Sequence, residues 1–441
     1  MHLIRQTASE SLGKNEFLLS YKMVASLLIK IFSHEVDGRL QMKNWVLSER
    51  MNKNYAVLAF FFSITLLSAC QRSESVKVNF NSGSHYIGEV QSEKKQGHGV
   101  FIWPNGARYE GGWKDDMQSG QGVFVDGAGA KYVGEWLAGK YHGDGVYTWP
   151  SGSQYRGQFQ KGEKSGQGVF EWANGDKYTG QWKQNKLEGF GIKTWHSGKS
   201  YEGEFRSGQM HGMGKLKWPD LHSYEGGFKN NLADGDGIYR WPDKTYYQGS
   251  FAKGMKRGKG VQVWADGHRY EGDFMDDKRS GSGLMKWPDG RIYKGQFALD
   301  EISGVGEMSW LNAEKYSGEF LSGSPSGTGI YSWPDGAIYN GLFRKGLKSG
   351  KGKYNYSDGR SYEGEFKQDL PDGSGDYSWP SGERYLGEFK SGQKQGKGVF
   401  YWADGSRYEG QFSNDKINGK GLCYFGDSGE GCEFKDGVRM D

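Results

Sequence analysis

Aromatic residues recur along the chain with a fixed period of 23 residues. A tyrosine opens each of fifteen successive units, from Tyr86 to Tyr408, and no insertion interrupts the series. Glycine follows two residues later in every unit, and an aromatic residue follows four residues later in all but the first, where Val90 stands. Alternation at i, i+2 and i+4 is the period of a β-strand. The pattern predicts a strand in each unit with its tyrosine, glycine and aromatic residue on one face.

A second strand is predicted in the other half of each unit. Counting the tyrosine as position 0, positions 11 and 13 are glycine in all fifteen units, as Gly212 and Gly214 show. Position 17 is tryptophan in twelve units and departs from it at Asp126, Tyr356 and Phe425. The same alternation places glycine, an often bulky residue and tryptophan together on one side of this strand.

Turn residues separate the predicted strands. A segment such as Trp103-Pro104-Asn105-Gly106 lies between units, and Pro and Asn-Gly are residues that reverse the chain. Within each unit except the first, position 7 is Gly, Asn or Asp, the residues that tolerate a positive φ. We predict an all-β, elongated, antiparallel β-hairpin repeat sheet or solenoid, single-layered and twisted. Thirty strands about 4.8 Å apart would extend roughly 140 Å if straight.

The periodic residues form the framework of this sheet. A glycine between two aromatic residues removes the side chain that would hold neighbouring rings apart, so rings can lie across the adjacent backbone. The intervening positions are polar, as Glu202 and Glu204 show, so we expect the opposite face to be wetted. Representative framework residues are Tyr86, Gly88, Tyr109, Gly111, Trp113, Tyr201, Gly203, Phe205, Gly212, Gly214 and Trp218.

Composition supports aromatic rather than aliphatic cohesion. Only 35% of the 441 residues are hydrophobic, whereas 73 are glycine and the aromatic residues number 16 Trp, 27 Tyr and 24 Phe. The net charge of +4 is small, the charges are interspersed, and no basic arm or recognition-helix pattern is present. We therefore expect no nucleic-acid partner.

An apolar run near the N-terminus predicts export. Residues 55–69 are almost wholly apolar, too few to span a bilayer as a helix but suited to the hydrophobic region of a signal peptide. Leu67-Ser68-Ala69-Cys70 resembles the bacterial lipobox, which implies lipidation of Cys70 and anchoring in a membrane. The alternative is an unprocessed interior helix with a chance cysteine. Gln71 in place of Asp favours the outer membrane, by resemblance to enterobacterial lipoproteins.

These features define the predicted organisation of the chain. Met51 begins a well-formed signal peptide, so we interpret residues 1–50 as a mis-assigned N-terminal extension and residues 51–69 as a lipoprotein-type signal peptide. A short linker follows at 70–85, the fifteen repeats at 86–430, and a degenerate C-terminal cap at 431–441. Cys423 and Cys432, the only cysteines besides Cys70, could pair across two adjacent strands.

The motif Tyr-x-Gly-x-Phe-x-x-Gly-x-x-x-Gly-x-Gly at this period resembles the membrane occupation and recognition nexus, or MORN, repeat. The resemblance runs from Tyr86 to about Phe425, most of the chain after Cys70. It implies an elongated hairpin sheet used as a scaffold or for dimerisation, with phospholipid binding proposed for the family. Kinase or methyltransferase domains occur in some relatives, and we expect none here, because the repeats occupy most of the residues after Cys70.

The sequence is compared with three classes of function: a scaffold, a ligand-binding module and an enzyme. The first is a membrane-anchored scaffold with a protein partner or self-association at the bacterial cell envelope, favoured because a surface is repeated without a unique pocket. The second is a module whose aromatic face binds phospholipid or glycan, although packing is expected to occupy those rings. The third, an enzyme, is disfavoured, and we expect no cofactor and no metal, because a catalytic site needs several groups in one place.

The titratable residues support this ranking. The histidines after Cys70 lie at unlike positions of separate units: His85, His98, His142, His196, His211, His222 and His268. An acidic residue recurs three residues after the tyrosine, at Glu89, Glu135, Glu204, Asp273, Glu319, Glu365 and Glu388. We interpret this row as a solvated face, with cation binding as a lesser alternative, since oxygens one repeat apart, about 9–10 Å, cannot share an ion.

Overall fold

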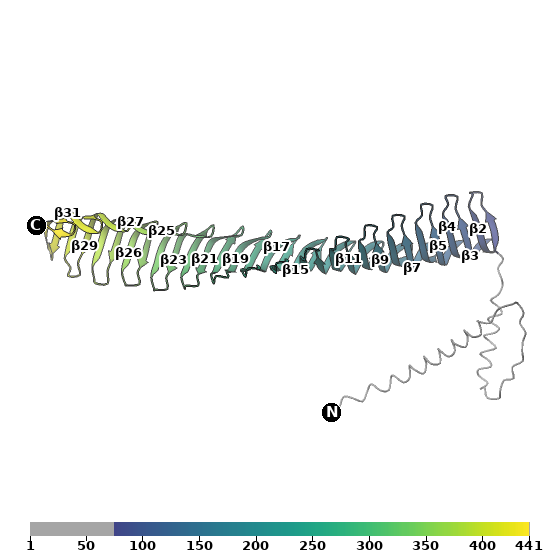
Figure 1. The fold of residues 1–441 in the computed structure, drawn as a ribbon, viewed down its shortest axis with the longest axis horizontal. Helices are drawn as coiled ribbons and strands as arrows, with labels where there is room; N and C mark the ends of the chain where they lie inside the picture. The colour runs from purple at the N-terminus through teal and green to yellow at the C-terminus, as the bar shows by residue number, and fades with distance from the viewer. Residues whose placement is uncertain (1–74, 441) are drawn as a thin grey trace, which may run out of the picture. The chain divides into compact units, whose positions relative to one another are not determined.

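One continuous antiparallel sheet contains the periodic units. The computed structural model describes residues 75–440, and in them it forms a single sheet of 33 strands. Each strand pairs with its predecessor and its successor in the chain, so that the array runs in sequence order, as the labels along the ribbon show (Figure 1). The sheet does not close, which confirms the predicted all-β, single-layer hairpin array. Residues 1–50, the predicted signal peptide 51–69 and Cys70 lie outside the described residues.

The first strand of each unit carries the tyrosine and is seven residues long. These strands are β2 (His85–Gln91), β4 (Arg108–Lys114), β6 (Lys131–Leu137), β8 (Gln154–Gln160), β10 (Lys177–Lys183), β12 (Ser200–Arg206), β14 (Ser223–Lys229), β16 (Tyr246–Ala252), β18 (Arg269–Met275), β20 (Ile292–Ala298), β22 (Lys315–Leu321), β24 (Ile338–Arg344), β26 (Ser361–Lys367), β28 (Arg384–Lys390) and β30 (Arg407–Ser413).

The second strand of each unit is longer, with nine residues in all but the last. These strands are β3 (Lys94–Ile102), β5 (Met117–Val125), β7 (Lys140–Thr148), β9 (Glu163–Glu171), β11 (Lys186–Thr194), β13 (Gln209–Lys217), β15 (Leu232–Arg240), β17 (Met255–Val263), β19 (Lys278–Lys286), β21 (Glu301–Ser309), β23 (Ser324–Ser332), β25 (Leu347–Asn355), β27 (Leu370–Ser378), β29 (Gln393–Tyr401) and β31 (Lys416–Phe425).

Two-residue turns join the strands within each unit. Between β18 and β19, Asp276 and Asp277 both adopt positive φ, 50° and 70°. Positive φ at both central residues identifies a type I′ turn, whose twist matches that of the flanking strands. Position 7 has a positive φ in every unit, so the predicted requirement for Gly, Asn or Asp there is confirmed.

A β-bulge explains why the second strand is longer. In β18 and β19, Gly272 pairs with Gly283, but Phe274 pairs with Arg279, so the second strand carries extra residues between these pairs. Gly281, at position 11, lies in the bulge with φ of 60°, a conformation that glycine adopts without steric cost. The invariant glycine at position 11 therefore has a backbone role.

The turn between units begins at the periodic tryptophan. The amide of Trp264 donates to the carbonyl of His268 at 2.9 Å, and Gly267 donates back to the carbonyl of Trp264 at 3.0 Å. The second strand thus ends at position 16, and the tryptophan predicted to be its last inward residue instead opens the turn. Its ring still packs against the buried aromatic cluster.

Three of these inter-unit turns lack the usual glycine at position 20. Leu221, Lys244 and Ala313 occupy it with φ of 69°, 76° and 68°. Left-handed backbone costs an L-residue about 1–2 kcal/mol, partly offset by the greater chain entropy lost by glycine. We expect Lys244→Gly to stabilise the sheet by about 0.5–1 kcal/mol, seen as a higher melting temperature. Gly267→Lys, at a φ of 91°, should lower that temperature; a rise would contradict this interpretation.

Additional strands lie at the two ends of the array. β1 (Val76–Asn79) pairs with β2, so part of the segment predicted as a linker belongs to the sheet. At the other end β32 (Ser428–Lys435) pairs with β31 and with the short β33 (Val438–Arg439). A disulfide between Cys423 and Cys432, with Cα atoms 5.9 Å apart, joins β31 to β32.

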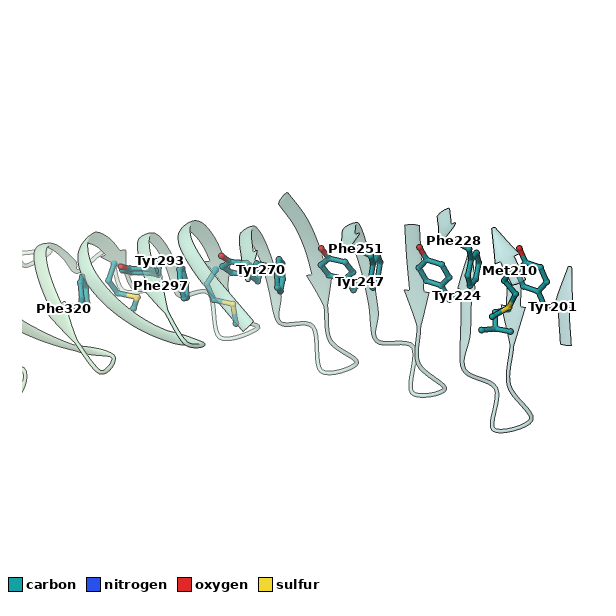
Figure 2. Packing of buried hydrophobic residues seen from close by; sticks show 14 of the residues in the cluster. Tyr201, Met210, Tyr224, Phe228, Tyr247, Phe251, Tyr270, Tyr293, Phe297 and Phe320 are labelled. Atoms are coloured by element: carbon teal, nitrogen blue, oxygen red, sulfur yellow. The ribbon is translucent and has the colours of Figure 1, made fainter. Parts of the chain in front are cut away.

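The core is a single layer of side chains on one face of the sheet, here called the aromatic face. The fifteen periodic tyrosines are almost completely buried in it. Along the array, the Tyr and Phe side chains that each first strand contributes, such as Tyr247 and Phe251 of β16, alternate in one row (Figure 2). Since each unit packs chiefly on the units beside it, cohesion is local and repeated.

Candidate functional site

The aromatic face is closed by its own packing. The ring of Tyr247 is fully buried and stands edge-on to Phe251 of its own unit and Phe274 of the next, with centroids 5.1 and 4.9 Å apart. Its hydroxyl donates to the carbonyl of Ser250 at 3.0 Å. A Cβ on Gly260 would lie only 2.5 Å from Cε2 of this ring. The glycine at position 13 therefore leaves the space in which the tyrosine ring lies, a role that the sequence indicated only for the glycine of position 2, between two aromatic residues.

Burial also removes these phenols from acid–base chemistry near neutral pH. Desolvation raises the pKa of Tyr86 and of Tyr224 to about 12, and the pKa of Tyr247 is raised as well. The tyrosines stay protonated, and a ring such as that of Tyr247 packs against aromatic rings of its own unit and of a neighbouring unit. This arrangement supports a structural role for the periodic aromatic residues.

A row of cations at position 9 covers part of the aromatic face. Lys164 is an example: its Nζ lies 4.8 Å from the centroid of Phe170 and 5.0 Å from that of Trp182. Burial lowers the pKa of Lys164, and the contact with the ring faces compensates part of the desolvation. The equivalent residues are Lys95, Lys256, Arg279, Lys348 and Lys394. This row was not predicted, although the sequence carries a cation at position 9 in six units.

The acidic row at position 3 has a defined partner in the sheet. Glu319 Oε1 accepts hydrogen bonds from the Thr328 amide at 3.0 Å and from its hydroxyl at 2.6 Å. Equivalent bonds link Glu204 to the amide of Met213, at 3.2 Å, and Asp273 to that of Ser282, at 3.1 Å. These amides follow the bulge glycine, so the side chain at position 3 satisfies a donor that the bulge takes out of the ladder. The row is more than a solvated face.

The Glu319 contact makes a pH-dependent prediction. Hydrogen bonds from Thr328 hold the pKa of Glu319 below its usual value of 4.5, so the carboxylate contributes stability above that pH and loses it as the pH falls through the lower, folded value. In NMR spectra, the amide signal of Thr328 should titrate with a midpoint below 4.5. Glu319→Gln should keep the bond and abolish that titration. A midpoint at or above 4.5 in the native chain would contradict the assignment.

The opposite side of the sheet, here called the reverse face, carries a long recess. A groove of about 1330 Å³ runs between Met213 and Ser317, across parts of six units, and we call it the reverse-face groove. Glycines of positions 2 and 13, such as Gly260 and Gly272, form its floor. A second stretch of about 570 Å³, between Asn340 and Leu386, has the same construction.

The lining of the groove differs from the wetted, polar face expected from the sequence. Position 14 is largely aliphatic, and Ile238, Val261 and Leu284 line the groove at that position. Met213 and Val305 add further apolar surface and are 61% and 60% exposed. Charged residues of both signs alternate with them: Glu225, Asp236, Lys259, Glu271, Lys294 and Glu307. The reverse face is therefore amphipathic. Its residues at positions 1 and 3 of the first strand are mostly polar, whereas those at position 14 of the second strand are mostly aliphatic.

The other candidate residues are not assembled into one site. The histidines of the described units lie apart; His222 bonds the hydroxyl of Tyr239 at 2.8 Å, and His268 pairs with Asp266 at 2.8 Å. Within residues 75–440 no group of three or more His, Cys, Asp or Glu is arranged to hold a metal ion. The same range contains no helix with the length and apolar character needed to cross a membrane.

Comparison with protein families gives the array its identity. The MORN repeat model matches fifteen segments: 86–108, 109–131, 132–154, 155–177, 178–200, 201–222, 224–246, 247–269, 270–290, 293–312, 316–338, 339–359, 362–384, 385–407 and 408–430. The chain belongs to the MORN-repeat family. The matched MORN segments coincide with the hairpins β2–β3 to β30–β31 and most of their inter-unit turns. No curated protein matches the sequence.

Solved structures show only a distant likeness to the MORN array. The TCP10 domain of Danio rerio CPAP, in complex with a peptide of STIL, is 13% identical with a TM-score of 0.18, covering 66% of this chain and 92% of that one. The TCP domain of Drosophila melanogaster SAS-4, with a proline-rich motif of Ana2, is 11% identical with a TM-score of 0.19, covering 44% and 86%. A streptogramin B lyase is 12% identical with a TM-score of 0.12, covering 67% and 92%. These scores are too low to carry an argument about function.

Proposed function

We propose that this MORN-repeat chain is a non-catalytic scaffold of the bacterial cell envelope that binds a protein partner in the reverse-face groove. The observation that supports this most is the groove itself, a recess of about 1330 Å³ that extends across several units. Its aliphatic lining residues and alternating charges suit an extended polypeptide segment, because successive side chains of such a segment can meet apolar and charged positions in turn.

The distribution of chemistry over the sheet favours binding over catalysis. The buried tyrosines keep their protons, and the acidic row at position 3 satisfies backbone amides of the bulges. Reactive groups are thus engaged in the fold at repeated positions, whereas a catalytic centre needs a unique constellation. A long sheet with one closed face and one amphipathic face is well suited to organise another chain.

Anchoring is proposed from the sequence before the array. The apolar residues 55–69 and the lipobox-like Leu67–Cys70 support export and lipidation at Cys70, and Gln71 supports delivery to the outer membrane. One cysteine with several acyl chains holds a protein to a bilayer without a transmembrane helix. Metabolic labelling with a radioactive fatty acid should mark the native chain in the membrane fraction and leave Cys70→Ala unlabelled. An unlabelled native chain in the soluble fraction would refute the anchor.

The groove can be tested separately from the anchor. The double variant Val261→Glu, Leu284→Glu adds two charges to the aliphatic lining of the groove and should abolish stable co-purification of the partner after mild crosslinking. Ile330→Glu is the matched control, because Ile330 occupies the same position 14 of another unit and does not line the groove. Both variants should keep the native melting temperature. Identical sets of co-purified proteins from all three chains would refute the groove as the interaction surface.

A further inference from the structure

A second row of aromatic side chains runs along the aromatic face beside the buried tyrosines. Residues of positions 15 and 17 alternate in it, and successive centroids are 4.3–5.9 Å apart. Its longest uninterrupted stretch, here called the ring ladder, consists of Trp310, Tyr331, Trp333, Tyr354, Tyr356, Tyr377, Trp379, Phe400 and Trp402. Unlike the tyrosines of position 0, these rings are only half-buried, so part of each is accessible to solvent.

The row is interrupted just before the ring ladder. Position 15 holds Gln262, Met285 and Met308 in three successive units, so no ring stands between the consecutive tryptophans from Trp241 to Trp310; in β19, Met285 lies between Trp264 and Trp287. A cavity of about 520 Å³ opens there, lined by both tryptophans, by Met285 and by Phe297. We call this cavity the ladder gap. Phenylalanine or tyrosine fills the equivalent position in many other units, so the gap is a local departure from the repeat rather than a feature of every hairpin.

Polar groups surround the apolar floor of the ladder gap. Asp266 pairs with His268 at 2.8 Å and keeps 64% of its side chain exposed. Arg279 pairs with Asp300 at 3.2 Å, while its guanidinium lies 5.8 Å from the ring of Trp264. With Glu301, three carboxylates face one guanidinium and one imidazole around the cavity. The rim offers many hydrogen-bonding oxygens and an excess of negative charge.

This combination matches the surface of a sugar ring. A pyranose has C–H groups on its faces, which contact tryptophan rings, and hydroxyl groups around its edge, which bond carboxylates and imidazole. The acidic rim disfavours anionic polymers and phosphate head groups because like charges repel. One repeat of the sheet advances by two strand spacings, about 9.6 Å, which is close to the length of one disaccharide unit in an extended β-1,4-linked glycan.

We propose that the ladder gap binds an uncharged, extended β-linked oligosaccharide, with Trp264 and Trp287 contacting sugar faces one disaccharide apart. The carboxylates of Asp266 and Glu301 accept hydrogen bonds from sugar hydroxyls at the rim. The half-buried rings of the ladder continue the same path toward the C-terminus. This site is independent of the reverse-face groove, since the two lie on opposite sides of the sheet.

Isothermal titration calorimetry of the full chain with cellotetraose and chitotetraose tests the proposal. Saturable binding of at least one of them is expected. Met285→Phe should abolish it while preserving the melting temperature, because phenylalanine occupies this position naturally in other units, as Phe170 shows. Trp287→Ala should weaken binding at least tenfold, whereas Trp149→Ala, beside a filled position, should leave it unchanged.

Three outcomes would overturn the proposal. The first is the absence of saturable heat with either oligosaccharide. The second is unchanged binding in Met285→Phe, which would show that the ladder gap is not the site. The third is stronger binding of a sulfated glycan, such as heparin, than of the uncharged oligosaccharides, which would contradict the role given to the acidic rim. None of these results would bear on the reverse-face groove.

Discussion

Tyr247→Ala is expected to destabilise the hairpins around it by about 3–5 kcal/mol, the range for deleting a large ring from a closed core. Tyr247 is fully buried and contacts rings in two successive units, so its removal opens a cavity that both units share. Because cohesion is local, the loss should appear as faster hydrogen exchange in β16–β19, with the distant strands little changed.

The variant Tyr247→Phe distinguishes the contribution of the ring to stability from that of its hydroxyl. This variant keeps both edge-on ring contacts and loses only the bond to the Ser250 carbonyl, so it should cost about 1 kcal/mol. Equal exchange in the Ala and Phe variants would contradict a core built on ring packing. Uniform acceleration over the whole array would instead contradict local cohesion.

Gly260→Ala is expected to cost about 3 kcal/mol although it adds a single methyl group. Its Cβ would lie 2.5 Å from the ring of Tyr247, which is fully buried, and the backbone of Gly260 is held in register with Gly249 of the adjacent strand. The measurement is again hydrogen exchange, together with the melting temperature of the whole chain.

Gly431→Ala provides the matched control for this substitution. Gly431 has no atom within 4 Å of its Cβ position and no left-handed φ, so alanine should be neutral or slightly stabilising there, by roughly 0.5 kcal/mol. If both substitutions had the same effect, the close approach of the tyrosine ring would not be the reason for glycine at position 13.

The fold could be predicted from the sequence because each unit repeats the same local requirements. The spacing of tyrosine, glycine and aromatic residue sets strand period and face, and position 7 marks the hairpin turn. The bulge could not be predicted in the same way. Gly281 and Gly283 stand at two positions that are glycine in every unit. Gly281 supplies a positive φ, whereas Gly283 makes space for Tyr270, and this difference depends on strand register.

Strand register also explains why the contacts of the side chains at positions 3 and 9 were not predicted from the sequence. Glu319 bonds an amide nine residues away, and Lys164 lies over a ring of the following unit, so neither role follows from neighbours in the sequence. The expectation of a wetted reverse face rested on positions 1 and 3. The aliphatic residues of position 14, such as Val261, join the same face only through pairing with position 1 of the following strand.

The two faces of the sheet thus differ in their burial and in the surfaces that they expose. The aromatic face holds the array together, and one opening in it lies where position 15 carries Met285 instead of a ring. The reverse face contributes little to the core and presents an amphipathic groove along the centre of the array. A protein partner and a small glycan could therefore be held by one sheet without competing for the same residues.

The central claim is that the periodic aromatic residues are buried by packing against one another. Spectrophotometric titration of the tyrosines tests this claim most directly. Burial raises the pKa of Tyr86, Tyr293 and Tyr339 to about 12, so their ionisation should be delayed while exposed phenols titrate near 10. A raised folded pKa gives stability that is complete below about pH 10 and lost toward pH 12, so the delayed phenolates should appear together with unfolding. Ionisation of most tyrosines near pH 10 in a folded sheet would contradict a closed aromatic face.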